Sequence, residues 1–183
     1  GLVGSEMCIR DSLYPVNRDR VDSNIESDSY DLDKPENFTS QGFPAIDYLL
    51  FGIGENDDSI VSKYLVSDSS HSKYLKDVVS KAVELTNIVK VDWEEGYRNT
   101  FVELTDNTAT SSINKLTNDF IFYYEKGFRA HKIGIPAGVF SGGPLPDRVE
   151  AYYGRIYSRV LAIEAANAVD NFFNGRSYGD NED

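Results

Sequence analysis

Pro44 and Asp47 lie three residues apart in the apolar stretch GFPAIDYLLFG, residues 42–52, and this spacing raises the question of a binding site. Residues three apart on a helix project from the same face, so positions 44 and 47 can address one ligand together. A histidine at the first position and a carboxylate at the second would offer one cation an imidazole and an oxygen ligand. Pro44 has no lone pair to offer, so Asp47 stands alone. The stretch is either a buried core helix that carries an acid or a ligand site that lacks one ligand.

The two histidines, His71 and His131, lie on different segments, and neither has a second histidine at ligand spacing. His71 stands near the start of a helix in SSHSKY, where we expect an exposed polar residue. His131 lies beside Arg129 and Lys132 near the C-terminus of a helix, the end that favours cations. The sequence contains no GxSxG, P-loop, CxxC or HExxH motif, so the common enzyme templates are absent.

The apolar spacing along the chain is helical, and no run alternates between apolar and polar residues for long enough to predict a strand. We expect four or five amphipathic helices, most of them longer than twenty residues, in an all-α fold of the up-and-down four-helix-bundle type. Beyond a short helix and loop in 17–37, the predicted helices begin near Ser40 or Gln41, at a Ser69 cap, near Ile113, and at an Asp147 cap. They end near Gly52, Leu104, Gly134 and Gly175. In the helix of the opening stretch, the spacing places Phe43, Ile46, Leu50 and Phe51 on one face, and we expect Asp47 on an inward face.

The composition excludes several classes of protein. A net charge of −12 argues against a nucleic-acid partner, because phosphate binding needs a basic face. No run of apolar residues is long enough to span a membrane.

Residues 1–12, GLVGSEMCIRDS, resemble a translated sequencing adapter and contain the only methionine and cysteine, Met7 and Cys8. We therefore expect residues 13–183 to form one helical domain, as a fragment that lacks native N- and C-terminal parts.

Several segments of the chain resemble the imelysin-like family. QGFPAIDYLLFG is similar to the family signature, GxHxxE followed by an apolar run, and HKIGIPAGVF, VEAYYGRIYSRVL and DNFFNG are similar to downstream segments. The similarity is particularly to lipoprotein-type members from Bacteroidetes. It implies an all-helical fold of two four-helix-bundle halves, a cell-envelope location and a link to iron uptake. Some members are named as metallopeptidases, including an insulin-cleaving one, and the GxHxxE pair is their proposed metal site.

In this resemblance Gly42 matches the motif glycine, Pro44 replaces its histidine and Asp47 replaces its glutamate. Asp47 keeps the charge on a side chain one methylene shorter, whereas Pro44 removes the nitrogen ligand. The candidate pocket residues are the three motif positions together with the cationic cluster of the third long helix: Gly42, Pro44, Asp47, Arg129, His131 and Lys132. Asp47 is the one candidate metal ligand of the motif, and the resemblance implies iron or another divalent metal as the cofactor.

The resulting expectation is a non-catalytic, imelysin-like cell-envelope protein that takes part in iron acquisition by binding a ligand or a metal. One alternative is a metallopeptidase whose ligands come from elsewhere, such as Asp47 with His131, Glu125 or Glu150. Another is a ligand-free helical scaffold in which Asp47 pairs with Arg129 or Lys132, because a buried carboxylate needs a partner. The expected partners are iron-uptake components of the envelope, and the expected location is periplasmic or outer-membrane-associated, with a lipid anchor upstream.

Overall fold

The computed structural model describes residues 16–67 and 69–176, and these residues form helices and connecting turns without any strand. The chain divides into two compact units, Gly1–Leu116 and Thr117–Asp183, which are described separately below. The adapter-like segment 1–12 and the polar end after residue 176 lie outside the described residues. Within the described part of the chain, no helix is long and apolar enough to cross a bilayer. The predicted all-α fold is confirmed.

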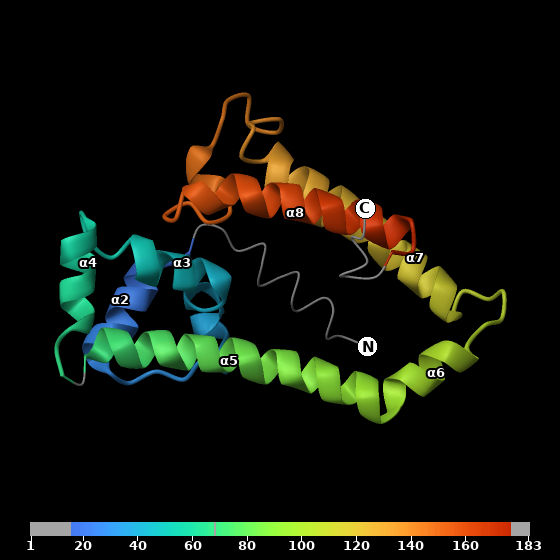
Figure 1. Cartoon of the computed structure of the whole chain (residues 1–183), viewed down its shortest axis with the longest axis horizontal. Helices are drawn as coiled ribbons and strands as arrows, with labels where there is room; N and C mark the ends of the chain where they lie inside the picture. The colour runs from blue at the N-terminus through green and yellow to red at the C-terminus, as the bar shows by residue number, and fades with distance from the viewer. Residues whose placement is uncertain (1–15, 68, 177–183) are drawn as a thin grey trace. The chain divides into compact units, whose positions relative to one another are not determined.

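The first unit consists of short helices placed against the first half of one long helix (Figure 1). Because α5 contacts α2, α3 and α4, it forms the spine of this unit. Its elements in chain order are α2 (Arg18–Ser27), η1 (Pro35–Ser40), α3 (Phe43–Phe51), α4 (Asp57–Tyr64), α5 (Ser70–Asp92), η2 (Trp93–Tyr97) and α6 (Arg98–Glu103), followed by the start of α7 (Ser112–Phe122).

Local capping explains where these helices begin. Asn17 accepts a hydrogen bond from the amide of Arg20 at 3.1 Å, and Asn56 accepts one from the amide of Ser59 at 2.9 Å. Ser69 accepts one from the amide of Ser72 at 3.5 Å, so the predicted cap of the long helix is confirmed. These side-chain oxygens satisfy first-turn amides that have no partner inside their helices.

The core of the first unit lies where α2, α3 and α5 meet. Val21, Leu49, Tyr74 and Val78 are the large apolar side chains with no more than a trace of exposed surface. Burial of this kind removes apolar area from water and is the main source of stability for a helical unit. The second half of α5 continues past this core with exposed side chains on all sides.

The predicted helix over 69–104 is continuous, but it changes its winding. A π-helical turn, η2, joins α5 to α6, and the rings of Trp93, Tyr97 and Phe101 lie 5.6–6.2 Å apart along this junction. Only α5, with 23 residues, exceeds twenty residues by itself among the described helices. Even when the π segments are counted, only the stretches 70–103 and 112–134 exceed twenty residues in the described part of the chain, so the expectation that most helices are this long is wrong.

The second unit is built from two antiparallel helical segments. Helix α7 continues into the π-helical segment η3 (Tyr123–Gly134), and α8 (Ile156–Phe173) contacts η3 (Figure 1). Phe120 stacks on Phe172 with ring centroids 4.9 Å apart. This pairing agrees with the predicted helical pattern of both segments.

The predicted Asp147 cap of the last helix is wrong. Asp147 lies inside a single 3-10 turn, η4 (Pro146–Arg148), and α8 begins only at Ile156. Ala151 and Arg155 adopt positive φ values of 53° and 38°, a conformation that an α-helix does not accept. Residues 149–155 therefore form turns and not the first part of the last helix, although their apolar spacing suits a helix.

Candidate functional site

Helix α3 carries the motif, and its two faces have opposite surroundings. Ala45, Tyr48 and Leu49 point into the core, whereas Phe43 is 70% exposed and Leu50 is 42% exposed. Phe43, Leu50 and Phe51, which the apolar spacing groups together, are therefore exposed, and the buried face is that of Ala45, Tyr48 and Leu49. Because nearly every residue of this helix is apolar, the sequence contains no polar face that would distinguish the inner side from the outer side.

The motif residues occupy the first turns of α3. Gly42 precedes the helix with φ at 77°, a left-handed conformation that glycine adopts without a Cβ penalty. Pro44 is buried in the first turn, where its missing amide would have had no helical partner. Asp47 lies one turn later and is half-buried.

Polar groups from two other helices, α2 and α4, form hydrogen bonds with residues of α3. The hydroxyl of Tyr48 donates to both carboxylate oxygens of Asp22 on α2, at 3.1 and 3.2 Å. The hydroxyl of Tyr64 on α4 donates to the carbonyl of Leu49 at 2.7 Å, and burial raises the pKa of Tyr64 to about 12. Neither contact could be predicted, because spacings of 26 and 15 residues along the chain leave no local sequence signal.

His71 lies closer to this region than its sequence suggests. It stands in the first turn of α5, half-buried, with its ring 6.2 Å from that of Tyr64, so the expectation of an exposed polar residue is wrong. Burial lowers the pKa of His71, the cation of Lys63 lowers it further, and the carboxylate of Asp22 partly opposes both. The neutral imidazole is therefore the favoured form in the folded protein.

The predicted cationic residues lie in the second unit, on η3. Arg129 contacts Glu125 at 2.5 Å between Nη2 and Oε2, and Lys132 forms an ion pair with Glu150. His131 is half-buried on the same segment. Asp47 belongs to the first unit, so its pairing with Arg129 or Lys132 stays a prediction.

A metal ion needs several converging donors, and the motif offers few of them. Pro44 supplies none, and Asp47 supplies a single carboxylate. Glu125 and Glu150, the alternative ligands, contact cationic side chains of their own unit. Across residues 16–67 and 69–176, no group of three or more His, Cys, Asp and Glu side chains is placed to hold a metal ion. The residues at the motif therefore do not fit the metal that the resemblance implies.

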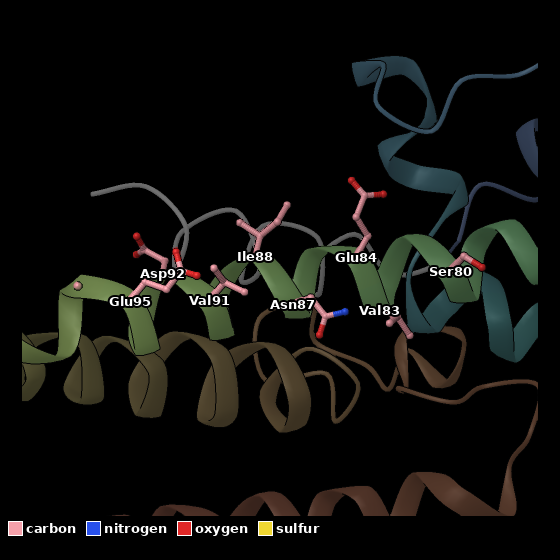
Figure 2. Close-up of a pocket in the computed structure, with 9 residues that line it drawn as sticks. Ser80, Val83, Glu84, Asn87, Ile88, Val91, Asp92 and Glu95 are labelled. Carbon is pink, nitrogen blue, oxygen red and sulfur yellow. The ribbon is translucent and has the colours of Figure 1, made fainter.

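Two recesses lie along α5, away from the motif. The larger one, of about 850 Å³, follows one side of α5 and η2, and its side chains from Ser80 to Glu95 are drawn in Figure 2. All of its described residues come from this one helical stretch, so they form a single wall. The smaller one, of about 300 Å³, has four carboxylates around Lys81: Asp31, Asp33, Asp77 and Glu84. Lys81 contacts Asp33 at 2.6 Å and Glu84 at 3.0 Å, so this cluster is a local ion-pair network.

Comparison with known proteins supports the resemblance carried by the motif. Residues 11–177 match the sequence model of the peptidase family M75, described as imelysin, and this range includes all of the described residues. No curated protein and no solved structure gives a match.

Proposed function

The chain belongs to the imelysin family, and from this premise we propose that it is a non-catalytic member that serves iron acquisition at the cell envelope by binding a ligand. The single observation that carries the proposal is Pro44. It occupies the motif position where metal-binding members have a histidine, and it is buried in the first turn of α3. A proline cannot coordinate a cation through its ring nitrogen once that nitrogen is part of a peptide bond.

The surroundings of Pro44 support the loss of metal chemistry. Asp47 is shorter than the glutamate of the family motif, and the structure offers it no neighbouring histidine on α3. Glu125 and Glu150, the alternative acids, belong to the second unit and form ion pairs with cations there. A peptidase of this kind would need a metal to activate water, so the donor set at the motif argues against hydrolysis.

A binding role needs surface that is ordered and accessible, and α3 supplies both. Its inner side is fixed by the buried residues Tyr48 and Leu49, while Phe43 and Leu50 remain on its outer side. The half-buried carboxylate of Asp47 adds a charge to this helix. Helix α3 therefore combines exposed apolar surface with one charge, and the proposed binding role uses this combination.

The roles in the envelope and in iron acquisition rest on family membership. A strain of the source organism that lacks this protein should grow more slowly than its parent when iron is chelated, and restoring the gene should restore growth. Equal growth of both strains under iron limitation would remove the iron-acquisition part of the proposal.

The non-catalytic part is tested by restoring the motif. The double variant Pro44→His, Asp47→Glu should gain binding of Zn²⁺ in calorimetry, because it provides an imidazole and a carboxylate one turn apart. The matched control Pro44→Ala, Asp47→Glu provides the carboxylate without the imidazole and should show no gain. Equal Zn²⁺ binding by the control and the double variant would mean that position 44 does not decide metal binding.

A further inference from the structure

A buried polar network joins α2, η1 and α5 directly beneath the chain that leads into α3. The amide nitrogen Nδ2 of Asn24 donates to Oδ1 of Asn37 at 3.0 Å, to the hydroxyl of Tyr74 at 3.1 Å and to the hydroxyl of Ser40 at 3.4 Å. Asn24 and Asn37 are each 4% exposed, and Ser40 and Tyr74 are fully buried. Every member of this group therefore bonds to protein rather than to bulk water.

The network fixes the backbone just before the motif. The hydroxyl of Tyr74 donates to the carbonyl of Ser40 at 2.8 Å, and the hydroxyl of Ser40 donates to the carbonyl of Asn37 at 3.0 Å. The next side chain, that of Gln41, is also buried and donates to the carbonyl of Leu32 at 2.8 Å. Hydrogen bonds of Ser40 to Tyr74 and Asn37, and of Gln41 to Leu32, thus fix two consecutive residues immediately before Gly42, which has a positive φ.

Helix α3 has no cap of its own that could set its direction. Gly42 has no side chain to accept from the first-turn amides, and Pro44 lacks an amide donor. The carbonyl of Gly42 accepts from the amides of Ala45 and Ile46, both at 3.1 Å, so the first turn of α3 depends on where Gly42 is held. The group that holds this position is the network around Ser40.

Apolar packing alone tolerates sliding and repacking, whereas a fully satisfied buried network accepts one arrangement. We propose that Asn24, Asn37, Ser40 and Tyr74 are positioning residues, which fix the start of α3 and thereby the direction in which Asp47 and the outer side of this helix are presented. The consequence for binding rests on the function proposed above, while the positioning of α3 stands without it.

The test removes one hydroxyl and follows individual amides in the full chain by hydrogen exchange. Tyr74→Phe keeps the buried ring and deletes the group that donates to the carbonyl of Ser40. The matched control is Tyr30→Phe, because Tyr30 packs edge-on against Tyr74 at 4.8 Å but donates its hydroxyl to Asp77, outside the network. The amide of Ile60 in the first turn of α4, which bonds to Asn56 at 3.1 Å, is the internal reference.

Tyr74→Phe should speed exchange at Ala45 and Ile46 by about tenfold or more, with little change at Ile60, because a local opening of α3 becomes easier. Ser40→Ala should act in the same direction, and Tyr30→Phe should leave all three amides as they are. Unchanged protection at Ala45 and Ile46 would overturn the proposal. An equal loss of exchange protection at all three amides would also overturn the proposal, since that result means a general loss of stability. No ligand takes part, so a failure of the binding proposal would not be mistaken for a failure here.

Discussion

The two units of this protein bury different kinds of side chain. In the first unit, Tyr74 and Leu49 are fully buried and a polar network lies among them. Within residues 117–176 of the second unit, the buried positions are glycines and one alanine, Ala151, while Ile156 is 74% exposed and Phe173 is 77% exposed. The motif helix thus belongs to the unit whose own core fixes it, and the cations predicted as its partners belong to the unit with little core of its own.

This difference shows which unit determines the geometry of the motif helix. Helix α3 is held by contacts with α2, α4 and α5, so the direction of Asp47 is a property of the first unit. Arg129 and Lys132 are held by ion pairs with Glu125 and Glu150 inside the second unit. A site that used residues of both units would therefore depend on two separately organised structures.

The largest expected effect comes from shortening one leucine in each unit, of which the first is fully buried and the second is exposed. Leu49→Ala should lower the free energy of unfolding by about 2–5 kcal/mol, because a fully buried leucine loses its contacts and leaves a cavity. Leu161→Ala is the matched change on α8, where the side chain is 38% exposed, and should cost less than about 1 kcal/mol. Urea unfolding measures both free energies, and equal losses in the two variants would mean that the two units do not differ in how well their leucines are packed.

A smaller effect should appear on acidification. Burial holds the pKa of His71 below its ordinary value, so protonation costs the folded protein more than the unfolded chain. The stability contributed by this group is present above the ordinary histidine pKa of about 6.5 and is lost as the pH falls through the lower folded-state pKa. His71→Gln should make the urea midpoint less sensitive to pH below about 6.5.

The comparison for this experiment is His131→Gln in the second unit. A loss of pH sensitivity in His71→Gln that does not occur in His131→Gln places the effect in the first unit, beside Tyr64. An identical pH profile for wild type and His71→Gln would contradict the assignment of this effect to His71.

The smallest effect is expected at the exposed pair of the second unit. Arg129→Ala should cost about 0.3–0.5 kcal/mol, since the pair with Glu125 spans four residues of one helical segment and both side chains are about half exposed. A cost above about 1 kcal/mol would indicate a further partner for Arg129. If the excess over the contribution of the Glu125 pair vanished in an Asp47→Asn background, Asp47 would be this partner, and the two units would share a polar contact.

Much of the fold could be predicted from the sequence, because long amphipathic spacing and caps act locally. The Ser69 cap and the helical course through residue 103 are confirmed. The start of α8 could not be predicted, since the positive φ values at Ala151 and Arg155 leave no signature in residues of ordinary helical type. The buried face of α3 could not be predicted either, because nearly all of its residues are apolar and no polar face marks the side exposed to solvent.

The candidate site was predictable only where it rests on a linear motif. Gly42, Pro44 and Asp47 are adjacent in sequence, and the structure places them in the first turns of one helix. The half-buried position of His71 and the contact between Tyr48 and Asp22 arise from packing of α2, α4 and α5 around α3. Such contacts between distant residues become visible only in the folded chain.

The central claim, that this member of the family has lost the metal chemistry of its motif, is tested most directly by titrating the wild-type protein with Zn²⁺, Fe²⁺ and Cu²⁺ in a calorimeter, with Asp47→Ala as the control. We expect no sub-micromolar binding of any of the three by wild type and no difference between wild type and Asp47→Ala. Sub-micromolar binding by wild type that disappears in Asp47→Ala would contradict it.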